Sequence, residues 1–136
     1  MTTLVWNDSY LVGVKEIDDQ HKKLFTIINS RFDLMKNAEN EEKLKEVLQE
    51  LNDYASYHFS TEEKYFQQFQ YEKTQEHTSL HNSYKDAMQL YTIKLNSENK
   101  ILVAYELMDY LVGWWIHHIT DEDQKYKQCF TSHGLK

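Results

Sequence analysis

The stretch ASYHFSTEEKYF, residues 55–66, raises the question that decides the fold class. It combines helix-favouring and aromatic residues at helical spacing, and it places His58 and Glu62 four positions apart. Residues at positions i and i+4 lie one turn apart on the same face of an α-helix. An imidazole and a carboxylate therefore occupy a helix face that should be apolar, and their presence there needs a chemical reason.

The composition of the whole chain favours long helices. The 136 residues include no proline and only three glycines, so few positions interrupt a helix. Hydrophobic residues make up 40% and charged residues 27% of the chain, which is an ordinary globular balance. This length is sufficient for one hydrophobic core, and we expect residues 1–136 to form a single domain.

The charge and the apolar runs disfavour several classes of protein. A net charge of −7 argues against binding to nucleic acid or to an anionic membrane surface. The longest clearly apolar run, YLVGWWI at 110–116, is too short to span a membrane, and the N-terminal MTTLVWNDSY lacks the features of a signal peptide. The single cysteine, Cys129, fits a reducing compartment. We therefore expect a cytoplasmic protein without a membrane span.

The rest of the pattern predicts four helices. The first seventeen residues lack helical periodicity and are predicted to form an arm, after which Asp18 or Asp19 is a candidate cap for a helix ending near Lys36. Further helices are predicted over 41–69, over 74–95 with Thr74 as its cap, and over 100–128. Polar turns at 37–40, 70–73 and 96–99 separate them, and a short tail follows.

Each predicted helix carries a seam, a row of side chains spaced alternately three and four positions apart, as in bundle helices. The four seams are His21, Phe25, Ile28, Phe32 and Met35; Leu44, Leu48, Leu51, Ala55, His58 and Glu62; His77, His81, Tyr84, Met88, Tyr91 and Leu95; and Ala104, Met108, Leu111, Trp115 and His118. Four such helices joined by short turns predict an all-α, antiparallel, up-down-up-down four-helix bundle with an N-terminal arm.

Five histidines lie in these seams, and the bundle should bring them to one level. His21, His77 and His81 lie near the starts of the odd-numbered helices, and His58 and His118 lie late in the even-numbered ones. In an antiparallel bundle these ends are adjacent. Burying so many polar groups without a strong partner costs about 1–3 kcal/mol each. A bound metal would offset that cost.

The number and type of candidate ligands favour a pair of iron ions. Five imidazoles with two or three carboxylates exceed the four ligands of a structural zinc site. Mixed nitrogen and oxygen ligation with open positions suits non-haem iron. Carboxylate-rich di-iron bundles use the motif Glu-x-x-His, but no histidine in this chain has a glutamate three positions before it. A histidine-rich centre is the alternative that remains.

At these positions the chain resembles the hemerythrin family, specifically the single-domain bacteriohemerythrins. The resemblance rests on WNDSY (6–10), IDDQH (17–21), HFSTE (58–62), HTSLH (77–81) and WWIHHITDEDQKY (114–126), and it covers nearly the whole chain. It implies two non-haem iron ions joined by an oxo or hydroxo bridge. Its implied ligands fall into three sets: His77, His81 and His118 for one iron, His21 and His58 for the other, and Glu62 and Asp123 as bridges. Dioxygen would bind at the vacant position of the second iron.

Helical geometry and the resemblance disagree about the second bridging carboxylate. In a regular α-helix, position 122 lies one turn after His118, whereas position 123 lies about 140° around the axis. Spacing alone therefore favours Glu122. The family pattern, H-I-x-x-x-D followed by x-x-Y, favours Asp123. We follow the resemblance and predict that the backbone between His118 and Asp123 departs from regular α-geometry, or that Asp123 leans in from the edge of the seam.

Apolar residues close to the candidate ligands are expected to form a dry wall around the bound dioxygen as well as part of the core: Leu24, Phe59, Trp114, Trp115 and Ile119. Many members of the family have leucine at the position of Trp115, so a bulkier ring is expected to narrow the pocket here. Tyr126, three positions after Asp123, is a candidate to orient that carboxylate. His117 and His133 lie outside the seams and are expected at the surface.

The leading functional hypothesis is reversible, non-enzymatic dioxygen binding for transport, storage or delivery, with an oxygen-consuming protein as the expected partner. The first alternative is a di-iron enzyme or sensor that handles peroxide, nitric oxide or oxygen. The second is a structural bundle with incidental histidines. The sequence shows neither a nucleophile–base pair nor a phosphate-binding loop.

Overall fold

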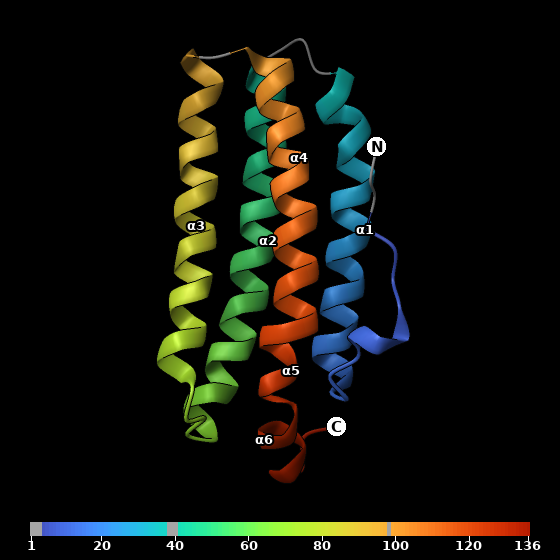
Figure 1. Cartoon of the computed structure of the whole chain (residues 1–136), viewed down its shortest axis with the longest axis vertical. Helices are drawn as coiled ribbons and strands as arrows, with labels where there is room; N and C mark the ends of the chain where they lie inside the picture. Colours follow the sequence, from blue (N-terminus) through green and yellow to red (C-terminus); the bar gives the residue numbers. More distant parts are fainter. Residues whose placement is uncertain (1–3, 38–40, 98) are drawn as a thin grey trace.

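The computed structural model describes residues 4–37, 41–97 and 99–136, and its helices form an elongated bundle (Figure 1). The long helices are α1 (Lys15–Asn37), α2 (Glu41–Gln68), α3 (Thr74–Ser97) and α4 (Lys100–His117). Helix α2 packs against α1 and α3, and α4 packs against the same two helices. The predicted all-α, antiparallel four-helix bundle is confirmed.

The seams form the core of this bundle. Every seam residue is buried except Tyr91, which is half-buried against the core. Leu107, which flanks the fourth seam, is buried as well. None of the described helices has the length and apolar character needed to cross a membrane.

The helix starts show how local polar groups set the boundaries. Helix α1 begins at Lys15, earlier than predicted, and neither Asp18 nor Asp19 caps it. The carboxylate of Asp18 instead accepts hydrogen bonds from the backbone N–H groups of Val12 (2.8 Å) and Gly13 (3.2 Å). Asp18 thus ties the preceding loop to the first turn of the helix, and this contact between neighbouring segments is what the sequence pattern did not reveal.

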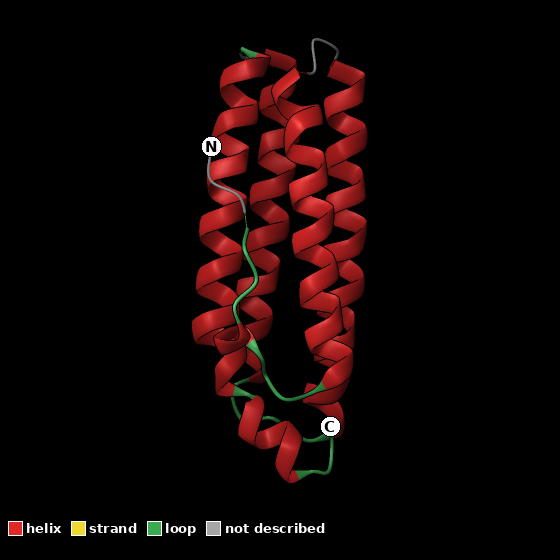
Figure 2. Ribbon diagram, turned by 90° about the vertical axis from the view of Figure 1, so that its right-hand side faces the viewer, coloured by secondary structure: helices red, strands yellow, loops and turns green. Residues whose placement is uncertain are grey.

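The arm packs along the outside of the bundle (Figure 2). It contains a short 3-10 turn, η1 (Asp8–Tyr10). The side chain of Asn29 on α1 accepts a hydrogen bond from the Leu4 N–H (2.9 Å) and donates one to the Leu4 carbonyl (2.7 Å). One amide side chain thereby satisfies both backbone groups of Leu4, much as a neighbouring strand would.

The connections lie close to their predicted positions where they are described. A turn joins α2 to α3 over residues 69–73, one residue longer than predicted because α2 ends at Gln68, and Gln70 has a positive φ of 52°. Helix α3 begins at Thr74, but Thr74 does not cap it as predicted, because its hydroxyl donates to the Tyr71 carbonyl, three residues earlier, instead of accepting from an N–H of the helix. Asn99 caps α4 by accepting from the Leu102 N–H at 3.1 Å. The turns predicted at 37–40 and 96–99 include residues 38–40 and 98, which lie outside the described residues.

The chain after α4 is not the continuous helix to residue 128 that periodicity predicts. A π-helical segment, η2 (His118–Glu122), is followed by α5 (Asp123–Lys125) and α6 (Lys127–Ser132). The break falls at Tyr126, where α6 turns aside below the bundle (Figure 1). Tyr126 and Phe130 stack there, within a second apolar cluster that closes this end of the molecule.

Candidate metal centre

Seven side chains meet inside the bundle, and each is at most 2% exposed: His21, His58, Glu62, His77, His81, His118 and Asp123. They are the residues for which the resemblance implies metal ligation. Their nitrogen and oxygen atoms form two groups, each with all atoms within 4.8 Å of one another. The groups are Glu62, His77, His81 and His118, and His21, His58, Glu62 and Asp123. Glu62 belongs to both, so two neighbouring sites share a carboxylate.

Asp123 lies between the two groups of histidines. Its Oδ2 is 3.0 Å from Nε2 of His21, and its Oδ1 is 3.1 Å from Nε2 of both His77 and His118. The two oxygens of one carboxylate therefore face histidines of different groups. This is the placement that a bridging carboxylate requires.

Glu62 lies between the same groups from the side of α2. Its Oε1 is 3.2 Å from Nε2 of His81 and 3.5 Å from Nε2 of His58. Its Oε2 accepts a hydrogen bond from the hydroxyl of Tyr126. The expectation that Tyr126 orients Asp123 is therefore wrong: because Asp123 points toward the histidines, the Tyr126 hydroxyl meets Glu62 on α2 instead.

The backbone of η2 explains how residue 123 reaches the cluster. The N–H of Asp123 donates to the carbonyl of His118, five residues earlier, which is the π-helical pattern. The extra residue in this turn places Asp123, rather than Glu122, one turn after His118. Glu122 is half-buried and pairs with Lys125 at 3.0 Å. The predicted departure from α-geometry is confirmed.

The unpaired polar atoms of the cluster test whether it fits metal ions. Among the described residues, no hydrogen-bond partner exists for Nε2 of His77, His81 and His118, for Oε1 of Glu62, or for either carboxylate oxygen of Asp123. Leaving a buried polar atom unsatisfied costs about 1–3 kcal/mol. These atoms converge on a shared space, and imidazole nitrogens with carboxylate oxygens are the ligands that iron accepts. The residues therefore fit a pair of metal ions.

Electrostatics keep both carboxylates of the cluster charged. Burial and the charge of Asp123 raise the pKa of Glu62. The histidines around it, His58 and His81 among them, lower the pKa by a larger amount, so it lies below its usual value. The pKa of Asp123 likewise lies well below its usual value, since His118, His21 and His77 together outweigh burial. Two buried anions in an apolar core call for positive charge nearby.

The two histidines nearest Glu62 differ in their ionisation. Burial lowers the pKa of His58 to about 3, so this ring is neutral at neutral pH. Burial also disfavours a charged His81, but the carboxylates of Glu62, 3.2 Å from its Nε2, and Glu63, hydrogen-bonded to its Nδ1, outweigh it and raise the pKa of His81 to about 9. In the absence of a metal ion, a proton on His81 therefore supplies part of the positive charge that balances the carboxylates of Glu62 and Asp123.

Aromatic rings from α2 and α4 cover the cluster. Phe59 stacks on the ring of His81 with 3.9 Å between centroids, and Trp114 stacks on His118 at 4.3 Å. Trp115 lies against Phe59, with its Nε1–H donating to the hydroxyl of Tyr84 at 3.4 Å. The other residues predicted for the wall are also buried: Leu24 and Ile119. Trp114 is half-buried.

Two contacts behind the histidines were not anticipated from the sequence. Oε1 of Gln20 lies 2.8 Å from Nδ1 of His58, and Oε2 of Glu63 lies 2.7 Å from Nδ1 of His81. Both residues lie outside the seams, which is why periodicity missed them. Each is the chain neighbour of a cluster residue, His21 or Glu62, and that adjacency is the signal that could have identified them.

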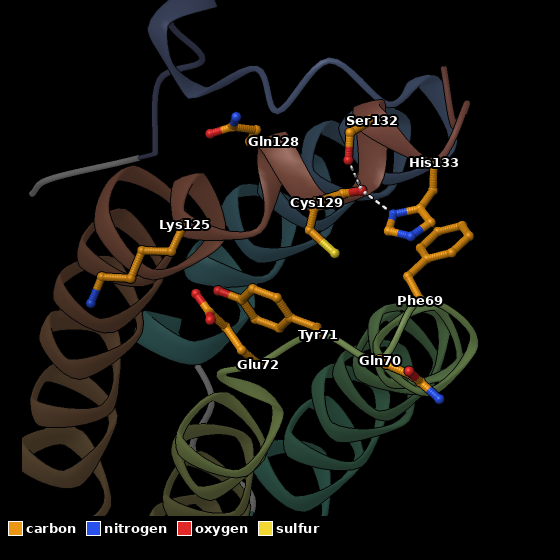
Figure 3. A pocket seen from close by; sticks show the side chains of 9 residues that line it. All are labelled: Phe69, Gln70, Tyr71, Glu72, Lys125, Gln128, Cys129, Ser132 and His133. Atoms are coloured by element: carbon orange, nitrogen blue, oxygen red, sulfur yellow. Dashed lines mark hydrogen bonds between the residues drawn. The ribbon is translucent and has the colours of Figure 1, made fainter.

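A separate hollow of about 370 Å³ lies at the end of the bundle near α6 (Figure 3). Its lining includes Cys129, whose carbonyl accepts hydrogen bonds from Ser132 and His133, but none of the seven cluster residues. Burial and the nearby Glu72 raise the pKa of the Cys129 thiol. His133 and His117 are exposed, as predicted.

Comparison with known proteins agrees with this geometry. Residues 12–130 match the Hemerythrin HHE cation binding domain. The chain is 33% identical over 125 residues to a bacteriohemerythrin of Clostridium acetobutylicum, a match that covers 90% of this chain and 97% of that protein. A bacteriohemerythrin of Pseudomonas aeruginosa is 30% identical over 126 residues, covering 93% and 80%. A crystal structure of wild-type hemerythrin superposes with a TM-score of 0.76 at 25% identity, covering 94% and 98%. The chain belongs to the hemerythrin family.

Proposed function

We propose that this protein binds dioxygen reversibly at a di-iron centre, as a non-enzymatic carrier or store. The observation that carries the proposal is the convergence of five imidazoles and two carboxylates in a buried cluster in which six of the facing atoms lack hydrogen-bond partners among the described residues. Membership of the hemerythrin family supports iron as the metal.

The ligand roles follow the two groups of the cluster. One iron would be held by His77, His81 and His118, the other by His21 and His58, and both by Glu62 and Asp123. Two iron ions in this place would supply the electrons that bind dioxygen and take them back on release. The hydroxyl of Tyr126 holds one oxygen of Glu62 and so fixes the orientation of that carboxylate.

The ligand set favours reversible binding over oxidation chemistry. The five imidazoles are neutral as ligands, and among the protein side chains of the ligand set only Glu62 and Asp123 contribute negative charge. A ligand set with more carboxylates would stabilise higher oxidation states of iron more strongly. This one should therefore release dioxygen rather than use it to oxidise a substrate.

The wall of the cluster excludes water, which would otherwise promote irreversible oxidation. Phe59, Trp115 and Ile119 are almost completely buried beside the histidines. Apolar surroundings of this kind control solvent access to a metal site and the properties of the bound ligand. We propose that an oxygen-consuming protein receives the dioxygen and that this takes place in the cytoplasm, since the single cysteine fits a reducing compartment.

Metal analysis and optical spectra test the proposal. Protein produced in iron-rich medium should contain two irons per chain, and its spectrum should change under oxygen and return under vacuum. Iron with a spectrum that changes once and does not return would indicate an enzyme or a sensor. Protein with no bound metal would indicate a structural bundle.

A further inference from the structure

We infer that Gln20 and Glu63 are positioning residues that orient two of the ligand histidines and make the two halves of the metal centre unequal. The inference rests on the proposed function, because it assigns roles toward the same metal ions. It is carried by the hydrogen bonds behind His58 and His81, on the side of each ring that faces away from the cluster.

The hydrogen bonds around Gln20 determine which nitrogen of His58 carries the proton. The hydroxyl of Thr61 donates its only hydrogen to the Tyr57 carbonyl (3.2 Å), so its oxygen accepts from Nε2 of Gln20 (3.2 Å). This places the amide oxygen of Gln20 against Nδ1 of His58 at 2.8 Å. An amide oxygen can only accept, so Nδ1 of His58 bears the hydrogen. Nε2 of His58 then presents its lone pair to the cluster, as a metal ligand must.

Gln20 is itself fixed by its surroundings. Its side chain is buried, and its backbone carbonyl accepts a hydrogen bond from the hydroxyl of Tyr54 at 3.2 Å. Gln20 belongs to α1, whereas Tyr54, His58 and Thr61 belong to α2. The network therefore joins the two helices that supply the histidines of one half of the centre, and it leaves the amide of Gln20 a single orientation.

Glu63 performs the same task for His81 with a negative charge. Its Oε2 lies 2.7 Å from Nδ1 of His81, and its side chain is 33% exposed. A carboxylate acceptor also fixes the hydrogen on Nδ1, but through a charge-assisted bond, which is stronger than a bond to an amide. A carboxylate behind a ligand histidine makes the ring a better electron donor to its metal.

The two halves of the centre differ as a result. His81 has an anionic partner, and it belongs to the group with three histidines. In the other group, His58 has a neutral amide partner, and Nδ1 of His21 has no hydrogen-bond partner among the residues that the structure describes. The three-histidine position should therefore bind a divalent metal more tightly and fill first.

Nitrogen NMR of the histidine rings in the metal-free protein tests the role of Gln20. Wild-type protein and Thr61→Ser, which keeps the hydroxyl, should show His58 protonated on Nδ1. Gln20→Leu and Thr61→Val should produce a substantial fraction of rings protonated on Nε2. A ring that remains protonated on Nδ1 in both of these variants would show that Gln20 does not orient His58.

Titration of the metal-free protein with cobalt(II) tests the inequality of the two halves. Glu63→Gln keeps an acceptor and removes the charge, and it should weaken the tighter of two binding steps by roughly 10- to 100-fold. Gln20→Leu should weaken the other step. Glu46→Gln, at an exposed position of the same helix, is the matched control and should change neither. Equal weakening of both steps by each variant, or no weakening, overturns the inequality.

The two experiments separate this inference from the proposed function. Wild-type protein that takes up no cobalt would refute the metal centre and the inequality together. The NMR result would still decide whether Gln20 orients His58. Two cobalt ions bound with unchanged affinities in the variants would leave the centre intact and reject the positioning roles.

Discussion

Replacing Trp115 by leucine tests how closely the wall of the proposed oxygen pocket is packed. The ring of Trp115 is completely buried, stacks on Phe59 with 5.5 Å between centroids, and lies 6.1 Å from the ring of His58. Its Nε1–H donates to the hydroxyl of Tyr84. The substitution removes the stack and the hydrogen bond but keeps an apolar side chain.

The expected loss of stability follows from these contacts. Truncating a buried tryptophan to alanine costs about 3–5 kcal/mol, and a buried leucine side chain recovers about 1.5–3 kcal/mol of that. The hydrogen bond to Tyr84 is long at 3.4 Å, so its loss adds only about 0.5 kcal/mol. We expect Trp115→Leu to lower the free energy of unfolding of the metal-free protein by about 2–3 kcal/mol, measured with urea.

The same substitution should change the exchange of dioxygen. A smaller side chain leaves space beside His58, so stopped-flow traces should show faster binding and release, or faster autoxidation. Trp6→Leu is the matched control: Trp6 is a half-buried tryptophan on the arm, packed against Phe25, and its replacement should leave the oxygen kinetics unchanged. If the traces of wild type and Trp115→Leu superimpose, Trp115 contributes only packing and our reasoning about access is wrong.

Three further predictions follow from the cluster. Asp123→Ala should lose or scramble the iron centre whereas Glu122→Ala should retain it, because the π-helical turn aims only Asp123 at the histidines; iron content decides, and a retained centre in Asp123→Ala contradicts the assignment. His58→Ala should abolish dioxygen binding and His133→Ala should not, as optical titration would show; equal binding by the two would reject the role of His58. In metal-free protein the pKa of His81 is raised to about 9, so its stabilising contribution is complete below the unfolded-state value and is lost as the pH rises through 9. The free energy of unfolding should then fall by about 3 kcal/mol between pH 6.5 and 9.5, and a flat profile would contradict the buried charge on this ring.

Hydrophobic periodicity was enough to predict the bundle and the level of the cluster. The seam that contains Ala55, His58 and Glu62 is buried throughout, because helices that pack side by side must bury a continuous stripe whatever its chemistry. The polar members could be predicted from their spacing alone. The helix boundaries were less predictable, since the start of α1 depends on how Asp18 holds the preceding loop.

The C-terminal end of the cluster needed more than periodicity. Regular helical spacing selects Glu122, and only the resemblance to hemerythrin pointed to Asp123 and hence to an irregular backbone. The π-helical turn resolves the conflict, because it adds one residue to the turn after His118. The partner of Tyr126 was also predicted wrongly. The short distance along the chain between Tyr126 and Asp123 does not show which helix the Tyr126 hydroxyl faces, and it faces Glu62 on α2.

The most direct measurement of the central claim is an oxygen titration of the anaerobically reduced protein, with iron measured on the same sample. The proposed centre predicts two irons per chain and saturation at one dioxygen for each pair of irons, with full recovery of the reduced spectrum when oxygen is removed. A sample that contains one zinc and no iron after growth in iron-rich medium, or one whose iron pairs take up dioxygen and never release it, would contradict reversible binding at a di-iron site.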